Sequence, residues 1–337
     1  MQAYSVSSFG IDNFSRVEQA KPLPSAKQVL IRVHAVSLNY RDLLVVKGIY
    51  NPKMKLPRIP CSDGAGEVVA VGDGVTRFRV GDRVAASFFQ NWSEGSPTAQ
   101  KTKGALGGDI DGMLAEFVAL NEAGVVGVPD HLTFEEAATL PCAAVTAWHA
   151  LMHGGEVKPG QVVLMQGTGG VSIFALQFAG LAGARVLGTS SSDEKLERAK
   201  KIGLSAGTNY KRNADWDKWA NEQTSGEGVD LVVEVGGTGT FAKSMRAVRV
   251  AGVIAQIGVL SSAVEPITVH PILHKSIRVQ GIYVGSRAMF EEMNAAIAQH
   301  KLRPVIDRVF EFAQAREALQ YMESGSHFGK IVVRVAG

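Results

Sequence analysis

The apolar and polar positions of the chain follow two periods, which divide it into three stretches. In roughly the first 125 residues, positions 29–35 alternate between apolar and polar side chains, which is the period of a half-buried strand. Apolar runs at 67–71 and 114–120 predict further strands, and a stretch rich in Gly, Ser and Lys at 90–112 predicts an exposed loop. The first stretch is therefore expected to be rich in β-structure.

From about residue 130, short apolar strands alternate with helices. Thr133 is expected to cap a helix, and helices are predicted over 172–182 and from Ser192 onward. The predicted strands of this stretch are 162–165, 185–188, 229–235, 253–257 and 277–283. Such alternation is typical of an α/β fold, in which helices cover both faces of a parallel sheet. After residue 284 the pattern is mixed again, with helices at 291–300 and 315–322 and a last strand at 330–335.

Length and composition narrow the class of protein. A chain of 337 residues predicts about two domains. The balance of 35 basic and 32 acidic residues excludes a strongly basic nucleic-acid binder. Two cysteines exclude a disulfide scaffold. The N-terminus lacks a signal-peptide pattern, and the uncharged run 159–184 is interrupted by glycines, so no membrane segment and a cytoplasmic location are expected.

A glycine-rich loop is the strongest local signal, because it lies between a predicted strand and a predicted helix. Of the 37 glycines, 18 fall within residues 151–260. The loop comprises Gly167, Thr168, Gly169, Gly170 and Val171. Here a glycine permits a sharp turn and close approach of a pyrophosphate, which the helix N-terminus attracts. Ser172 stands where the dinucleotide-binding pattern has its third glycine, so an ordinary glycine-rich turn is the alternative.

The end of the next strand indicates which dinucleotide is bound. An NAD enzyme usually has an acidic residue there to hold the ribose 2′-hydroxyl. This chain has Ser190 and Ser191 instead, followed by Lys195 within one helical turn. Hydroxyls and an ammonium group suit a 2′-phosphate, so NADP(H) is favoured over NAD(H). Alternatively, the serines only cap the following helix.

Several motifs, in order, resemble the medium-chain dehydrogenase/reductase superfamily, in particular its zinc-free quinone oxidoreductase-like members. They are Ser37–Asp42, Gly64–Val69, Val80–Val84, Leu140–Ala147, the glycine-rich loop and His327–Val332. The resemblance implies a GroES-like β domain over 1–143 and 284–337, with a Rossmann NADP-binding domain, a doubly wound parallel sheet, inserted over 144–283. It also implies a homodimer that forms through the Rossmann sheets.

The same resemblance locates the positions of a lost zinc site. The ligand positions of zinc alcohol dehydrogenases correspond to Asn39, Ser62 and Cys142, of which only Cys142 is a usual ligand. Asp63 replaces a motif glutamate, and the cysteines of a structural zinc site are missing. No metal is therefore expected. A degenerate site of Cys61, Asp63 and Cys142 is the alternative.

The resemblance also implies individual site residues. Tyr50 aligns with a tyrosine that enoyl thioester reductases place near the substrate. Alternatively, it is an aromatic residue that only packs at the start of a loop. Tyr40 is a weaker candidate that is expected to pack. Asn39 is expected near the nicotinamide, with a catalytic and a cofactor-binding role, or else as a turn residue. The further cofactor contacts implied are Thr146, Tyr210, Gly258, Tyr283, Val284 and Lys330, where Lys330 contacts the phosphates or is a solvated surface lysine.

Together these features predict an NADPH-dependent, zinc-independent oxidoreductase. A conjugated carbonyl delocalises developing charge, so hydride addition to a quinone or an α,β-unsaturated carbonyl needs only hydrogen-bond donors. The first alternative is an NAD(P)-dependent alcohol dehydrogenase, with or without residual metal, and the second is a non-enzymatic dinucleotide-binding protein. The expected ligands are small molecules, with no nucleic-acid or membrane partner.

Overall fold

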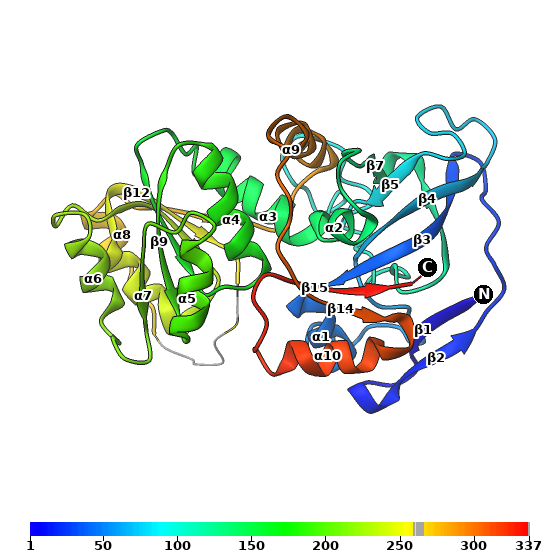
Figure 1. Cartoon of the computed structure of the whole chain (residues 1–337), viewed down its shortest axis with the longest axis horizontal. Helices are drawn as coiled ribbons and strands as arrows, with labels where there is room; N and C mark the ends of the chain where they lie inside the picture. Colours follow the sequence, from blue (N-terminus) through cyan, green and yellow to red (C-terminus); the bar gives the residue numbers. More distant parts are fainter. Residues whose placement is uncertain (259, 261–265, 336–337) are drawn as a thin grey trace. The chain divides into compact units, whose positions relative to one another are not determined.

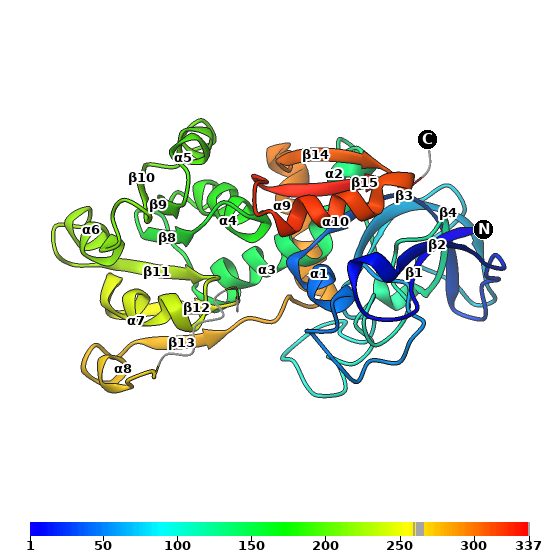
Figure 2. The same cartoon turned by 90° about the horizontal axis from the view of Figure 1, so that it is seen from below.

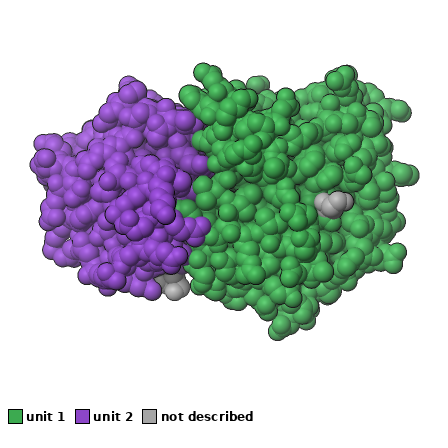
Figure 3. All heavy atoms as spheres, in the orientation of Figure 1, with its two compact units in different colours: residues 1–145, 285–337 green, residues 146–284 purple. Residues whose placement is uncertain are grey.

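The chain divides into two compact units, which Figure 3 distinguishes by colour. The computed structural model describes residues 1–258, 260 and 266–335. The β unit comprises Met1–Val145 with Gly285–Gly337, and the α/β unit comprises Thr146–Val284. The domains that the resemblance implies have their limits at 143/144 and 283/284.

The β unit is built mainly on antiparallel strands, with one parallel pair, β14 and β15. One sheet has the order β14-β15-β3-β4-β5-β7, with β6 also paired to β3, and β1 and β2 form a separate pair. These strands are β1 (Gln2–Val6), β2 (Phe14–Glu18), β3 (Gln28–Leu38), β4 (Asp63–Val71), β5 (Arg83–Ala86), β6 (Phe117–Asn121), β7 (Val125–Gly127), β14 (Ile306–Glu311) and β15 (Lys330–Arg334). β15, from the end of the chain, lies beside β3, from its beginning (Figure 1).

Helices pack against the strands of the β unit. The helix cap predicted at Thr133 is confirmed, because its side chain accepts from the Glu136 backbone N–H at 3.2 Å at the start of α2, and Glu136 completes a capping box. The helical elements are η1 (Ile11–Asn13), α1 (Tyr40–Val46), η2 (Glu122–Gly124), α2 (Phe134–Ala138), η3 (Leu140–Ala144), α9 (Arg287–His300), η5 (Phe312–Gln314) and α10 (Ala315–Glu323). α10 packs against α1, β14 and β15, as the orange and red elements of Figure 2 show. The first and last parts of the chain therefore share one hydrophobic core.

The α/β unit contains the predicted parallel sheet, in the order β10-β9-β8-β11-β12-β13. Every neighbouring pair in it is parallel. The strands are β8 (Val162–Gln166), β9 (Arg185–Ser190), β10 (Ala206–Asn209), β11 (Val229–Glu234), β12 (Val248–Gln256) and β13 (Arg278–Gly281). Numbered by sequence the order is 3-2-1-4-5-6, which is that of the Rossmann fold. The predicted fold class is confirmed.

Helices connect the parallel strands and cover the sheet. α4 packs on β8 and β9, α5 on β9 and β10, and α7 on β11 and β12. The helical elements are α3 (Val145–Trp148), η4 (His149–Gly154), α4 (Gly170–Leu181), α5 (Asp193–Lys200), α6 (Trp216–Glu222), α7 (Thr238–Ala247) and α8 (His270–His274). The uncharged run 159–184 forms β8, a turn and α4. Among the described residues, no helix has the length and apolar character needed to cross a membrane.

Candidate functional site

The glycine-rich loop has the shape that a pyrophosphate requires. Gly167 has φ +70°, the left-handed region that favours glycine, and turns the chain from β8 into α4. A Cβ atom at Gly167 or Gly169 would meet no other atom within 4 Å, so the space beside the backbone is open. Ser172 donates its hydroxyl to the Gln166 carbonyl at 2.7 Å, which ties the helix to the strand where the pattern expects a glycine. These residues fit a dinucleotide phosphate.

The residues predicted to read the ribose lie together at the end of β9. The Tyr210 backbone N–H donates to the Ser190 carbonyl at 3.0 Å, so Tyr210 follows directly beside the serines. Ser190 is buried and its hydroxyl accepts from the Ser192 N–H at 3.3 Å, while Ser192 caps α5 at the Lys195 N–H. Ser190 and Ser192 thus have a capping role. Ser191 and Lys195 are partly exposed, as is Tyr210, and these are the side chains within reach of a ligand.

A buried polar network, which the sequence pattern did not indicate, lies where the strand order reverses, between β8 and β11. Glu234 is fully buried at the end of β11 and accepts hydrogen bonds from Gln166 Nε2 at 2.7 Å and from the Gly236 and Gly237 N–H groups at 2.8 and 3.0 Å. Ser244 also donates to this carboxylate. Ligands bind at such a reversal point in open α/β sheets. Glu234 therefore orders the backbone beside the predicted cofactor edge.

Gly258 lies against this ordered turn. A Cβ atom at Gly258 would lie 1.9 Å from the Val235 carbonyl oxygen, so only glycine allows the two backbones to approach so closely. Its N–H donates to the Glu234 carbonyl at 3.1 Å. The predicted position of Gly258 at the carboxyl edge of the sheet thus has a structural reason.

The remaining predicted contacts of the α/β unit lie at its two ends in the chain. Thr146 is buried in α3. Val284 is buried, has φ +54° and accepts a hydrogen bond at its carbonyl from His149 Nδ1 at 2.7 Å. Burial lowers the pKa of His149, so the neutral ring that donates to Val284 is favoured. Tyr283 is half exposed.

In the β unit, strand register brings Lys330 to Asn39, although the two are distant in sequence. Ile331 pairs with Leu38 across β15 and β3, which places Lys330 opposite Asn39. Lys330 Nζ donates to the Asn39 side-chain oxygen at 2.7 Å and to the Leu38 carbonyl at 2.8 Å. Lys330 is only 3% exposed. It is therefore not a solvated lysine, and its ammonium group is engaged within the β unit instead of reaching outward to phosphates.

Asp63 and Ser62 complete a cluster with these two residues, which we call the Lys330 cluster: Asn39, Ser62, Asp63 and Lys330. Asp63 is fully buried, with its carboxylate 4.0 Å from Lys330 Nζ. It accepts from the Ser62 hydroxyl at 2.7 Å and from the Cys142 N–H at 3.1 Å. Ser62 Oγ in turn lies 3.5 Å from Asn39 Nδ2. The positions that resemble zinc ligands thus meet around an ammonium group.

The donor atoms at this place do not fit a zinc ion. Asn39 and Ser62 offer a neutral amide and a hydroxyl, whereas catalytic zinc sites use three His, Cys or acidic ligands. Burial raises the pKa of both Cys61 and Cys142, which disfavours the thiolate that binds metal. Within residues 1–258, 260 and 266–335, no three His, Cys, Asp or Glu side chains form a group that could hold a metal ion.

Asp63 predicts a pH dependence of folding stability. Burial raises its pKa from 3.8 to about 6, although Lys330 and the hydrogen bonds act in the opposite direction. The folded state therefore holds this proton more tightly than the unfolded chain. The resulting stabilisation is complete below the unfolded pKa and is lost as pH rises through about 6, a change of about 3 kcal/mol.

Denaturant unfolding at about pH 4 and about pH 7.5 measures this contribution. Asp63→Asn should flatten the profile relative to the wild type, since asparagine does not titrate. Equal pH profiles for the two proteins would contradict the assignment.

Of the two candidate tyrosines, Tyr50 and Tyr40, the second differs from its expected burial. Tyr50 is 39% exposed, and its ring lies 5.1 Å from the guanidinium carbon of Arg41. Tyr40, expected to pack, is instead 42% exposed at the start of α1. The reason is the orientation of α1, which buries the side chains of Asp42, Leu43, Val45 and Val46.

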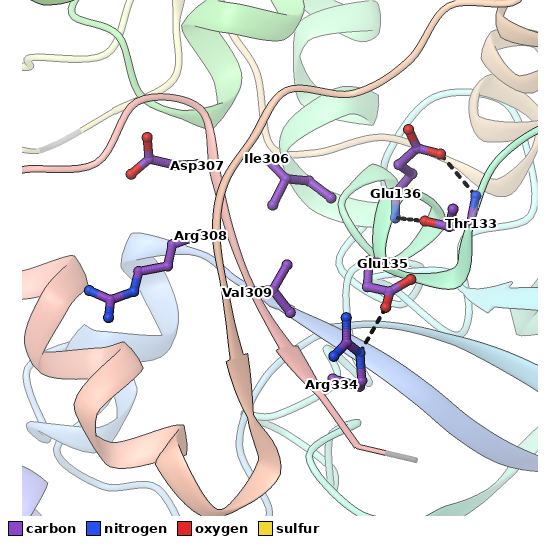
Figure 4. A pocket seen from close by; sticks show the side chains of 8 residues that line it. All are labelled: Thr133, Glu135, Glu136, Ile306, Asp307, Arg308, Val309 and Arg334. Atoms are coloured by element: carbon purple, nitrogen blue, oxygen red, sulfur yellow. Dashed lines mark hydrogen bonds and ion pairs between the residues drawn. The ribbon is translucent and has the colours of Figure 1, made fainter. Parts of the chain in front are cut away.

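A separate open hollow of the β unit carries no catalytic chemistry. It has a volume of about 440 Å³ and is lined by residues from α2, β14 and β15, as Figure 4 shows. Most of its charged groups have partners within the β unit: Arg334 pairs with Glu135 at 3.0 Å and with Glu311, outside the lining, at 3.0 Å, and Glu136 pairs with Arg303 at 2.7 Å. None of the residues predicted from the sequence to form the site lines this hollow.

Comparison with known proteins shows the family of the chain. Residues 25–130 match the alcohol dehydrogenase GroES-like domain, and residues 170–299 match the zinc-binding dehydrogenase family. A zinc-type alcohol dehydrogenase-like protein of Schizosaccharomyces pombe is 45% identical, over 96% of this chain and 97% of its own.

Solved structures of this family have a similar fold. An alcohol dehydrogenase-type structure from Sinorhizobium meliloti 1021 has a TM-score of 0.92 and 39% identity over 99% of this chain and 98% of its own. A quinone oxidoreductase from Pseudomonas syringae has a TM-score of 0.85 and 28% identity over 99% of each chain. The chain belongs to the medium-chain dehydrogenase/reductase superfamily of dinucleotide-binding oxidoreductases.

Proposed function

We propose that this oxidoreductase reduces quinones or α,β-unsaturated carbonyl compounds with NADPH and without zinc. The observation that carries the proposal is the Lys330 cluster, where a buried ammonium group lies among the positions that resemble zinc ligands. An alcohol substrate needs strong polarisation of its oxygen, which a zinc ion supplies. A conjugated carbonyl needs less, because the charge that develops on hydride addition is already delocalised.

The α/β unit supplies the cofactor site of this proposal. When bound, NADPH provides the hydride. The open backbone at Gly167 and Gly169 and the N-terminus of α4 hold its pyrophosphate. Ser191, Lys195 and Tyr210 surround the expected place of the 2′-phosphate. Ser190 supports this site through its carbonyl, which holds the backbone of Tyr210.

The β unit supplies the groups that act on the substrate. Asn39 is held by Lys330 through its side-chain oxygen, and its amide nitrogen faces Ser62 Oγ at 3.5 Å and the Asp63 carboxylate, so the cluster fixes the position of the amide. An amide binds a nicotinamide or a carbonyl oxygen without adding charge. The Tyr50 hydroxyl, on a half-exposed ring, orients the substrate oxygen or donates the proton that completes the reduction.

NADPH oxidation with a panel of quinones, enones and aldehydes tests the proposal. Turnover of the conjugated substrates, with the C=C bond or quinone reduced in the product, supports it. Reversible oxidation of simple alcohols with NADP⁺ or NAD⁺, without turnover of any conjugated substrate, would favour the alcohol dehydrogenase alternative. Tight dinucleotide binding without turnover would favour a binding role.

Tyr50→Phe should lower kcat for enones about 100-fold, because positioned proton donors contribute 10²–10⁴-fold to rate. The unfolding midpoint should stay close to that of the wild type, since the hydroxyl is on a half-exposed ring. Steady-state kinetics and a thermal melt measure both. If Tyr50→Phe keeps the wild-type kcat, the hydroxyl takes no part in the reaction and the tyrosine ring only packs.

We also propose a homodimer that forms through the β13 edge of the parallel sheet. Among the residues that the structure describes, β13 pairs only with β12, and all four of its residues are exposed, which leaves a strand edge open for pairing. Val279 on β13 is 38% exposed and Leu273 on α8 is 75% exposed. Exposed apolar side chains beside an open strand edge suit a second copy of this chain.

Replacing Val279 and Leu273 together by lysine should shift the protein to a monomer in light scattering after gel filtration. Like charges then meet across the two-fold axis. Leu23→Lys, at an apolar residue 84% exposed in the β unit, is the matched control and should leave the mass unchanged. A wild-type monomer, or a dimer that survives the double substitution, would contradict this interface.

A further inference from the structure

Arg41 has a buried guanidinium group whose polar contacts with the described residues all involve Nη1. Its side chain is 10% exposed, follows Asn39 by two positions and comes from the first turn of α1. Nη1 donates to the Leu106 carbonyl at 2.6 Å and lies 3.6 Å from the Asp42 carboxylate. These two contacts fix the plane of the guanidinium.

The opposite edge of the same group is unsatisfied. Nε and Nη2 are both buried and have no hydrogen-bond partner among the described residues. These two atoms share one edge of the planar guanidinium, so their N–H bonds run nearly parallel and match the two oxygens of a carboxylate. Buried donors without partners are rare and costly, which points to a missing ligand.

The surroundings leave this edge free of competing acceptors. A Cβ atom at Gly108 would lie 2.3 Å from Nη2, so a larger residue there would displace the end of the Arg41 side chain. Phe88 and Tyr50 lie against the guanidinium, with ring centres 4.9 and 5.1 Å from Cζ. Flat rings on a guanidinium restrict the open directions to its plane, which favours a planar ligand group.

The local charges favour an anion. Arg41 and Lys330 face two buried carboxyl groups, Asp42 and Asp63. Burial raises the pKa of both acids, against the opposing influence of Arg41 on Asp42 and of Lys330 on Asp63. Guanidinium groups stay protonated in proteins. Burial thus disfavours the charged form of the two carboxyl groups that lie nearest these side chains.

We propose that the Nε/Nη2 edge of Arg41 binds a substrate carboxylate, so that the preferred substrates are conjugated carbonyl compounds that carry a carboxylate near the reacting double bond. The inference rests on the proposed reduction for its substrate class. Tyr50 lies against the same guanidinium, so one bound molecule can present its carboxylate to Arg41 and its carbonyl to the tyrosine hydroxyl. Arg41 is then a specificity-determining residue.

The test compares trans-4-oxopent-2-enoate with its methyl ester, which has the same conjugated system and no charge. In the wild type, kcat/KM for the acid should exceed that for the ester about 10-fold or more. Arg41→Gln should lower the acid-to-ester ratio about 10- to 100-fold, the range for losing a charged hydrogen-bonded contact. Arg41→Lys, which keeps the charge and loses the parallel N–H pair, should give an intermediate ratio. Arg58→Gln is the matched control, since Arg58 is 16% exposed and pairs with Asp111 at 3.1 Å, and it should keep the wild-type ratio.

A binding measurement separates this inference from the proposed reaction. Calorimetric titration with 4-oxopentanoate, which has no double bond to reduce, should show binding to the wild type that weakens at least about 10-fold in Arg41→Gln or Arg41→Lys. Such binding without turnover of either enone would support the carboxylate site and reject the proposed reaction for this class. Turnover of the ester with no preference for the acid, or equal ratios in wild type and variants, would overturn the carboxylate site and leave the reaction standing.

Discussion

Lys330→Met is expected to lower the free energy of unfolding by about 3–5 kcal/mol, the usual cost of removing one partner from a buried ion pair. The loss has two sources. Asp63, which is fully buried, would lose the ammonium group that lowers its pKa, so it would have to take up a proton or carry a charge without a partner. The Asn39 side-chain oxygen and the Leu38 carbonyl would also lose their donor. Denaturant unfolding followed by circular dichroism measures the change.

The double variant Asp63→Asn with Lys330→Met is the control for charge. It should recover part of the lost stability, because a neutral amide needs no counter-charge in a buried place. If Lys330→Met unfolds within about 1 kcal/mol of the wild type, the ammonium group does not stabilise the cluster. The role given to Lys330 in holding Asn39 would then have no support.

Ser190→Asp is expected to lower the affinity for NADPH roughly 100-fold, because a carboxylate at the end of β9, directly beside Ser191 and within one helical turn of Lys195, would repel the 2′-phosphate that these residues are proposed to hold, and a like charge placed nearby costs several kcal/mol. The affinity for NADH should stay the same or rise, since an acidic residue at this position accepts hydrogen bonds from the ribose 2′-hydroxyl. Fluorescence titration of both cofactors measures the two constants.

Ser190→Asn is the matched control, because asparagine has the shape of aspartate without its charge. It should keep a preference for NADPH, although its size disturbs the hydrogen bond from the Ser192 N–H to Ser190. If the wild type binds NADPH and NADH with equal affinity, the preference for NADPH is contradicted. It is also contradicted if Ser190→Asp and Ser190→Asn lower the affinity for NADPH by the same factor.

The sequence predicts those features of the fold that depend on residues close together in the chain. The glycine-rich turn, the α5 cap at Ser192 and the alternation of apolar strands with helices depend on residues close together in sequence. The order of the parallel sheet follows from that alternation once the family resemblance is added. For the same reason Gly167 and Gly169 lie where the pattern expects them.

Contacts between distant segments were not predictable in this way. Lys330 meets Asn39 only because β15 returns to pair with β3, and a lysine at the start of a strand gives no sign that it will be buried. Glu234 was hidden within a predicted apolar strand, and its partner Gln166 ends another. The only local sign was a carboxylate just before two glycines, where a turn of backbone N–H groups can bind it.

The proposed reaction without zinc depends on the Lys330 cluster, in which a lysine ammonium group lies among the positions that resemble zinc ligands. The most direct test is the rate of NADPH oxidation by an enone, measured on protein dialysed against a chelator, before and after zinc is added back. We predict the full rate in the dialysed protein and no increase with zinc. A rate that is lost on dialysis and restored by one equivalent of zinc would contradict the proposal.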